Sequence, residues 1–183
     1  MAKKAIIVLA EGFDEIEAVT SIDILRRAEI DITVAGLGNL NVKGSRVLIV
    51  TSDKKLDEAG IDYDACIFPG GMPGATNLAN SEKVKKLIQK MDSAGKIIAA
   101  ICASPAIVLG PVGILKNKSA TCYPGMEQNF KSDVKYKDND VVVDGNIITS
   151  RGPATALLFS LAIVKKLVGK EIADRIKKAV LAG

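Results

Sequence analysis

The residue with the clearest chemical potential is Cys102, which stands between an apolar run and a helix-start signal. Residues 96–101 form a short apolar run with β-branched side chains, typical of a strand covered on both faces. Ser104 and Pro105 then mark the start of a helix. A sharp strand-to-helix turn presents a nucleophile above a sheet, and a helix N-terminus favours the thiolate. The alternative is a small core residue, since free cysteine is commonly buried.

The sequence contains no histidine. A Ser-His or Cys-His dyad within the chain and a histidine-ligated metal site are therefore both excluded. Acid–base chemistry must use a carboxylate, a lysine, a tyrosine or water. Glu17 is a candidate because it follows the first predicted strand, at the edge where open parallel α/β sheets bind ligands. The alternative is that Glu17 only complements the dipole of its helix.

A glycine-rich loop, residues 69–74, follows the predicted core strand 65–68, whose Cys66 is expected to be packed in the core. Its glycines let backbone N–H groups approach a ligand closely, and such amides can form an oxyanion hole beside a nucleophile. The loop matches neither a P-loop nor a dinucleotide-binding GxGxxG motif. An ordinary strand-to-helix turn is the alternative interpretation.

Strands and helices alternate along the chain, which is typical of an α/β protein with a parallel sheet. Strands are predicted at residues 5–9, 31–36, 65–68 and 96–101, and short strands at 134–136, 141–143 and 147–149. Helices are predicted at residues 14–28, 81–94, 154–168 and 171–181, with a shorter one ending at 109. Asp14 and Ser81 are the expected N-caps. The first helix is expected to bury an apolar side made of Ile16, Val19, Ile22, Ile24 and Leu25. The strand-like residues 46–51 either join the sheet or form a separate ribbon.

Length and composition favour a single domain over residues 1–183. The net charge of +4 is mild, and the lysines are scattered with few aromatic residues between them, which argues against nucleic-acid binding. We expect no membrane-spanning stretch and no signal peptide, because apolar runs are short and acidic residues follow closely on the N-terminus. The three cysteines lack disulfide or zinc spacing, which predicts a reducing cytoplasm.

Five motifs, taken together, resemble the ThiJ/PfpI superfamily, and within it the branch of bacterial YajL and the parkinsonism-associated deglycase. They are AICASPA at 100–106, FPGG at 68–71, DEIEA at 14–18, ATCYPG at 120–125 and TSRGP at 149–153. The resemblance implies a flavodoxin-like three-layer sandwich of the class I glutamine amidotransferase type, with a mostly parallel sheet. It also implies a homodimer and no cofactor.

The resemblance also implies roles for particular residues. Cys102 matches the family's reactive cysteine, and Glu17 matches a glutamate whose protonated carboxyl donates a hydrogen bond to the thiolate. That donated bond and the helix dipole are expected to lower the thiol pKa, while burial beside a thiolate raises the carboxyl pKa. The backbone amides expected to form an oxyanion hole belong to Gly70, Gly71 and Ala103. The candidates to line the site are Cys122, Tyr123, Arg26, Arg46 and Arg151. For Arg26 and Arg46, solvated surface is the alternative.

Two departures from the family pattern bear on the chemistry. The protease-like branch has a histidine directly after the cysteine, whereas this chain has Ala103, which argues against protease or amidotransferase activity. Tyr123 stands where some relatives have a histidine, so a mechanism that needs a second proton shuttle there is not supported.

Two functions fit this site. The first is a glyoxalase or deglycase that acts on small dicarbonyls such as methylglyoxal, or on their early protein adducts, through the Cys102 thiolate with Glu17 as proton shuttle. The second is a non-catalytic redox sensor or redox-regulated chaperone of the oxidative stress response, in which Cys102 is oxidised to a sulfinate. A disulfide between Cys102 and Cys122 is a third alternative.

Overall fold

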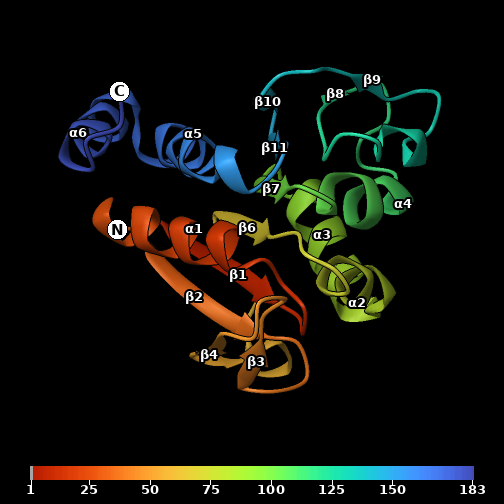
Figure 1. The fold of residues 1–183 in the computed structure, drawn as a ribbon, viewed down its shortest axis with the longest axis horizontal. Helices are drawn as coiled ribbons and strands as arrows, with labels where there is room; N and C mark the ends of the chain where they lie inside the picture. Colours follow the sequence, from red (N-terminus) through yellow and green to blue (C-terminus); the bar gives the residue numbers. More distant parts are fainter. Residues whose placement is uncertain (1) are drawn as a thin grey trace.

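The computed structural model describes residues 2–183 as three layers, with a sheet between two sets of helices (Figure 1). The strand order in the sheet is β10-β11-β7-β6-β1-β2-β5, and all neighbours are parallel except the β10–β11 hairpin. The sheet strands are β1 Lys4–Leu9, β2 Asp31–Gly36, β5 Lys54–Lys55, β6 Ala65–Phe68, β7 Ile97–Ile101, β10 Val141–Asp144 and β11 Ile147–Ser150. Two smaller pairs are β3 Asn41–Lys43 with β4 Ile49–Thr51, and β8 Ser119–Ala120 with β9 Lys135–Tyr136. The predicted three-layer, mostly parallel α/β fold is confirmed.

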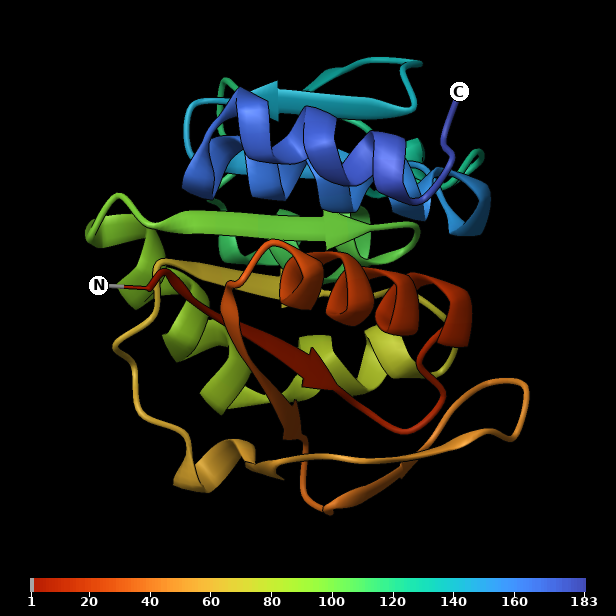
Figure 2. The same cartoon turned by 90° about the vertical axis from the view of Figure 1, so that its left-hand side faces the viewer.

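Helices cover both faces of the sheet (Figure 2). One face packs against α1 Glu15–Arg27 and α5 Ala156–Val168, and α6 Lys170–Ala179 packs on α5. The other packs against α2 Gly74–Asn80, α3 Glu82–Ser93 and the helical turns η2 Pro105–Leu109 and α4 Gly110–Val112. The remaining short turns are η1 Leu56–Glu58, η3 Glu127–Asn129 and η4 Pro153–Thr155. Because apolar layers cover both faces, the central strands β6 and β7 are buried along their whole length.

The predicted helix caps are present. Asp14 accepts a hydrogen bond from the Glu17 backbone N–H, and Ser81 accepts one from Val84. The expected apolar side of α1 is partly wrong, because Ile16 and Val19 are exposed. The buried side instead includes Glu17, Ala18, Ser21, Ile24 and Leu25. The apolar residues of α1 spread over more than one helix face, and the sheet and α5 cover only one of them.

The strand-like residues 46–51 do not join the central sheet. Ile49–Thr51 forms β4, which pairs with β3 as an antiparallel ribbon, and the preceding turn places Val47 in the left-handed region at φ 69°. Glu15 holds this turn against α1, because its carboxylate accepts hydrogen bonds from the Arg46 N–H and the Ser45 hydroxyl. Helix α2 was not predicted, since it begins inside the glycine-rich loop, where the sequence favours a turn.

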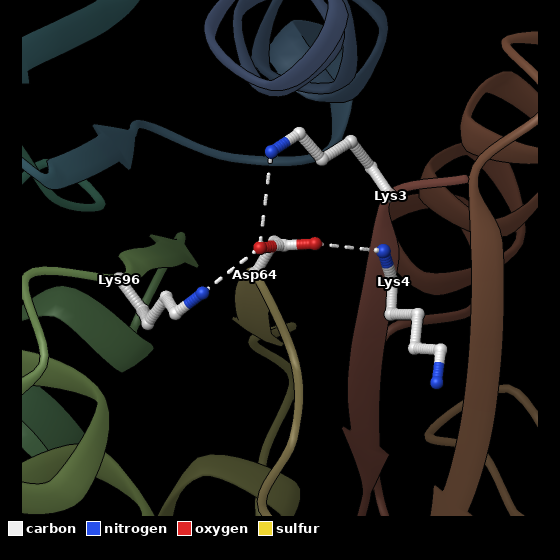
Figure 3. A network of polar contacts seen from close by, with 4 residues as sticks. All are labelled: Lys3, Lys4, Asp64 and Lys96. Carbon is white, nitrogen blue, oxygen red and sulfur yellow. Dashed lines mark hydrogen bonds and ion pairs between the residues drawn. The ribbon is translucent and has the colours of Figure 1, made fainter. Parts of the chain in front are cut away.

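The amino ends of three central strands are held together by Asp64, which directly precedes β6 (Figure 3). Its carboxylate accepts hydrogen bonds from the Lys4 backbone N–H at 3.1 Å and from the Lys96 ammonium at 2.9 Å, and it pairs with Lys3 at 3.9 Å. These lysines lie on or just before β1 and β7, the two neighbours of β6. The contacts therefore fix the strand ends on the edge of the sheet opposite to Cys102.

The chain crosses from one side of β1 to the other between β5 and β6, because β2 and β5 lie on one side of β1 and β6 and β7 on the other. At such a switch point the loops that leave adjacent strands diverge and open a crevice at the carboxyl ends of the strands. Glu17, the glycine-rich loop and Cys102 follow β1, β6 and β7 respectively, and so meet at this edge. Within residues 2–183, none of the helices is both long enough and apolar enough to span a membrane.

Candidate active site

Cys102 is held in a strained turn between β7 and η2. Its φ is 64°, in the left-handed region that side chains rarely adopt and that costs about 1–3 kcal/mol. Surrounding hydrogen bonds enforce this conformation: the Cys102 N–H donates to the Ser150 carbonyl at 2.9 Å, and its carbonyl accepts from the Tyr123 N–H at 2.8 Å. The Ser104 hydroxyl ties the turn to the glycine-rich loop by donating to the Pro69 carbonyl at 2.7 Å. The predicted strand-to-helix elbow is therefore present.

Glu17 is completely buried, although it lies in the first turn of a helix where glutamate is usually solvated. Its Oε2 atom accepts a hydrogen bond from the Gly70 N–H at 2.7 Å. Its Oε1 atom is buried and has no close hydrogen-bond partner among residues 2–183. The carboxyl group lies beside the Cys102 thiol, and no cation among residues 2–183 is paired with it. Glu17 therefore does more than complement the helix dipole.

Gly70 is required by the close approach of the loop to both groups. A Cβ at this position would lie 2.6 Å from Cys102 Cβ and 3.0 Å from both Cys102 Sγ and Glu17 Oε2. The Gly70 carbonyl also accepts a hydrogen bond from the Asp14 N–H at 2.9 Å. Both backbone polar groups of Gly70 are thus bound to the start of α1, so its amide is not available for an oxyanion. The amides of Gly71 and Ala103 face the Cys102 sulfur instead.

Burial, and to a smaller extent the charge of Asp14, raise the pKa of Glu17 to about 8. The hydrogen bond from Gly70 and the nearby Cys102 thiol act in the opposite direction and are outweighed. A carboxylate without a cation loses more by leaving water than two hydrogen bonds return. Glu17 consequently keeps its proton well above the pH at which an exposed glutamate ionises.

The pKa of the Cys102 thiol is raised to about 12, first by burial and then by the charge of Glu17 and their hydrogen bond. The N–H groups of Gly71 and Ala103 lower it. This direction differs from the expected lowering of the thiol pKa. The charge of Glu17 and its hydrogen bond raise the thiol pKa only when Glu17 is ionised. A protonated Glu17 carries no charge and can instead donate a hydrogen bond to the sulfur. At neutral pH the two groups are therefore mostly protonated and carry little charge between them, because a negative charge on either would be poorly solvated.

A cavity of about 400 Å³ opens above the thiol. The predicted residues Gly71, Ala103 and Tyr123 line it together with Cys102. Met72 and Met126 also line it and were not predicted from the sequence. The sequence indicates these two methionines only by their position, since Met72 lies inside the glycine-rich loop and Met126 directly follows the 120–125 motif.

The other predicted site residues do not line this cavity within residues 2–183. Arg26 is near the far end of α1, about 13 Å along the helix from Glu17, and pairs weakly with Asp53. The Arg46 side chain is exposed. Arg151 pairs with Asp138 at 2.8 Å and lies near Cys122.

The thiols of Cys66 and Cys122 are fully buried, and burial raises the pKa of both. All three cysteines are free thiols in the structure. Residues 2–183 contain no group of three or more cysteine or acidic side chains arranged to hold a metal ion.

Comparison with known proteins agrees with this architecture. A family model described as the DJ-1/PfpI family matches residues 3–166. The chain belongs to the DJ-1/PfpI family. The resemblance predicted from the five motifs is thereby confirmed.

Individual members of the DJ-1/PfpI family match nearly the whole chain. Protein DJ-1 homolog B of Arabidopsis thaliana is 46% identical over 175 residues, which are 94% of this chain and 40% of that protein. The glutathione-independent glyoxalase DJR-1.2 of Caenorhabditis elegans is 33% identical over 178 residues, covering 96% of this chain and 95% of that protein. The crystal structure of Drosophila melanogaster DJ-1beta superposes with a TM-score of 0.96 at 41% identity, covering 100% of both chains. This chain spans less than half the length of the Arabidopsis relatives it matches.

Proposed function

We propose that this protein is a cofactor-free glyoxalase or deglycase, acting on methylglyoxal-type dicarbonyls or their early protein adducts. The observation that carries the proposal is the buried Glu17 carboxyl beside Cys102, whose raised pKa keeps a transferable proton next to a nucleophile. The name of the Caenorhabditis elegans relative, a glutathione-independent glyoxalase, supports the same reaction class. The absence of histidine leaves Glu17 as the buried acid–base group in contact with the thiol.

The proposed reaction begins when Glu17 keeps the proton and Cys102 is the thiolate. The sulfur adds to the aldehyde carbon of methylglyoxal, and the carbonyl oxygen takes the proton of Glu17, which leaves a hemithioacetal and the Glu17 carboxylate. The Glu17 carboxylate then removes the proton from the former aldehyde carbon, and the resulting enediol is reprotonated on the neighbouring carbon. The product is a thioester of lactate, which water hydrolyses to lactate and the free thiol. The aldehyde carbon is oxidised while the ketone carbon is reduced, so no external oxidant is needed.

The surroundings of Cys102 support the charged steps. The amides of Gly71 and Ala103 lie next to the sulfur and lower its pKa, and the same donors would stabilise an oxygen on the attacked carbon. The strained Cys102 backbone fixes the thiol before substrate arrives. The cavity opens to the surface, since the Met72 and Tyr123 side chains are about half exposed.

The decisive experiment is production of lactate from methylglyoxal by the full chain, Cys102→Ser and Cys66→Ala. We expect Cys102→Ser to lose at least about a hundredfold in kcat/KM, because removal of a nucleophile leaves only binding and oxyanion contributions. Cys66→Ala removes a buried thiol far from the cavity and should retain most of the activity. Wild-type turnover no faster than that of Cys102→Ser would rule out the proposal.

A second candidate function, a redox sensor or redox-regulated chaperone, is favoured by the unequal exposure of the three cysteines. Cys102 is the partly exposed thiol, whereas Cys66 and Cys122 are completely buried. A protonated Glu17 can donate a hydrogen bond to a sulfinate oxygen on Cys102. Mass spectrometry after mild peroxide should show a two-oxygen adduct on Cys102, and equal labelling of Cys66 and Cys122 would contradict it.

We also propose that the protein is a homodimer, through exposed apolar side chains on α1 and the turn before β4. Ile16 and Val19 of α1 and residues 47–49 of the turn are exposed, and Glu15 holds the two segments together. An apolar patch of this kind usually marks an interface. Light scattering should give twice the chain mass for wild type and for Ile61→Asp, and the single-chain mass for Val47→Asp. A monomeric wild type would refute it.

A further inference from the structure

The cavity above Cys102 has two chemically different sides. The inner side consists of the sulfur and the N–H groups of Gly71 and Ala103, which suit the oxygen of a reacting carbonyl. The outer side is formed by Met72, Tyr123, Pro124 and Met126, and no charged side chain of residues 2–183 lines the cavity. The reacting end of a bound molecule is therefore recognised by polar groups and its other end by an apolar wall.

Backbone contacts hold this apolar wall in position relative to the sulfur. The Tyr123 N–H donates to the Cys102 carbonyl at 2.8 Å, and the Met126 N–H donates to the Tyr123 carbonyl at 3.0 Å. The Tyr123 ring lies against the backbone of Gly152, where a Cβ would come within 3.3 Å of Tyr123 Cδ2. The ring and the Met72 side chain are nevertheless about half exposed, so each still has apolar surface that a ligand can cover.

We propose that this wall makes the enzyme prefer α-ketoaldehydes with an apolar substituent of ring size, such as phenylglyoxal, over methylglyoxal. The inference rests on the proposed function, because the preference is expressed only if Cys102 attacks the aldehyde. A methyl group leaves most of a cavity of about 400 Å³ unfilled, whereas a phenyl ring can stack on Tyr123 and contact both thioethers. A single methylene in an apolar pocket is worth about 10- to 200-fold in kcat/KM.

The chemistry balances as for methylglyoxal. Phenylglyoxal and one water give mandelate, with the aldehyde carbon oxidised and the ketone carbon reduced within the same molecule. The sulfur–carbon bond formed at the aldehyde carbon is broken when water hydrolyses the thioester. The wall takes no part in these steps and acts only on binding and orientation.

The first test compares kcat/KM of the full chain for phenylglyoxal, 4-carboxyphenylglyoxal and methylglyoxal, from initial rates measured before arginine modification. We expect phenylglyoxal to exceed 4-carboxyphenylglyoxal by at least about tenfold, since the carboxylate would be placed against a wall without a cation. Phenylglyoxal should also exceed methylglyoxal. Equal values for the two aryl compounds would overturn the inference.

The second test uses Met126→Ser and Met72→Ser, with Ile61→Ser as a control that removes an apolar side chain about as exposed as Met72 elsewhere on the surface. We expect the phenylglyoxal-to-methylglyoxal ratio of kcat/KM to fall about tenfold in the methionine variants and to stay constant in the control. A ratio unchanged in both methionine variants overturns the inference. Turnover of methylglyoxal without an aryl preference refutes only the preference, whereas no product from any of these compounds refutes the proposed function as well.

Discussion

Glu17 and Asp64 lie near opposite ends of the same strand, β6, and the pKa values of their carboxyl groups are shifted in opposite directions. Asp64 precedes β6, is partly exposed and is surrounded by lysines, and the Lys96 hydrogen bond is the main reason that its pKa is lowered. Glu17 meets the loop that follows β6, is completely buried and has no cation, so burial raises its pKa to about 8. At the amino ends of the strands the charged form of Asp64 is stabilised, whereas at their carboxyl ends the charged form of Glu17 is disfavoured.

This contrast distinguishes Asp64, a carboxylate that stabilises the fold, from Glu17, a carboxyl group that can take part in proton transfer. A charge paired with lysines at the surface is present throughout the neutral pH range and helps to hold the strand ends together. A buried carboxyl beside a thiol can exchange its proton with that thiol near neutral pH, which is what general acid–base catalysis requires. The same strand therefore serves stability at one end and the candidate active site at the other.

The largest expected effect on stability follows from Glu17→Gln, which replaces the buried carboxyl by an uncharged amide. Between about pH 4.5 and pH 8 the folded Glu17–Cys102 pair holds a proton that the unfolded carboxyl has released, so wild-type stability falls as pH rises through this range. Glu17→Gln lacks this penalty, and its free energy of unfolding should exceed that of wild type by up to about 5 kcal/mol at pH 8. Urea titrations at pH 5 and pH 8 measure the difference.

The control for this prediction is Glu11→Gln, which changes an exposed glutamate and should show no such pH dependence. Glu17→Gln should also lose about 10²- to 10⁴-fold in turnover of methylglyoxal, because its amide cannot shuttle a proton. A stability difference between Glu17→Gln and wild type that is the same at both pH values would contradict the shift in the Glu17 pKa.

A smaller effect is expected when the loop is pushed away from the pair by Gly70→Ala. The new Cβ would lie 2.6 Å from Cys102 Cβ, so the loop must move and we expect a loss of about 1–3 kcal/mol. The reaction rate of Cys102 with iodoacetamide should change as well, because the hydrogen bond from Gly70 to Glu17 is disturbed. Gly60→Ala is the matched control, since nothing lies within 4 Å of a Cβ there. Equal melting temperatures for the two variants would argue against the close approach.

The smallest effect is expected at the other end of β6, from Asp64→Asn. Partly exposed ion pairs contribute little, so the loss at pH 7 should be at most about 1 kcal/mol, with methylglyoxal turnover unchanged. Because the Asp64 pKa is lowered on folding, its contribution is present above the unfolded pKa near 3.8 and is lost as pH falls below it. The stabilities of wild type and Asp64→Asn in urea titrations should therefore approach each other as the pH is lowered below about 3.8. Reduced turnover in Asp64→Asn would mean that the contacts of Asp64 at the amino end of β6 affect the candidate active site at its carboxyl end.

Local signals predicted much of the fold. The caps at Asp14 and Ser81 and the apolar runs of β1, β6 and β7 are properties of short segments, and each forms where it was expected. The separate ribbon of β3 and β4 and the exposure of Ile16 could not be derived in the same way. Both depend on which surfaces the rest of the chain leaves uncovered, and apolar composition does not specify this.

The sequence by itself determined that Cys102 lies at a strand-to-helix turn and that no histidine can assist it, because both follow from residue types and their order. The resemblance named Glu17 as its partner, but only the tertiary structure decided that Glu17 is completely buried and that Gly70 is bound to it. It also decided that Met72 and Met126 form an apolar wall. Glu17 and Gly70 are 53 residues apart, and the burial that raises the Glu17 pKa arises only when β1, β6 and β7 lie side by side. The pKa of Glu17 depends on the groups that surround it in space, and its neighbours in the sequence do not reveal these.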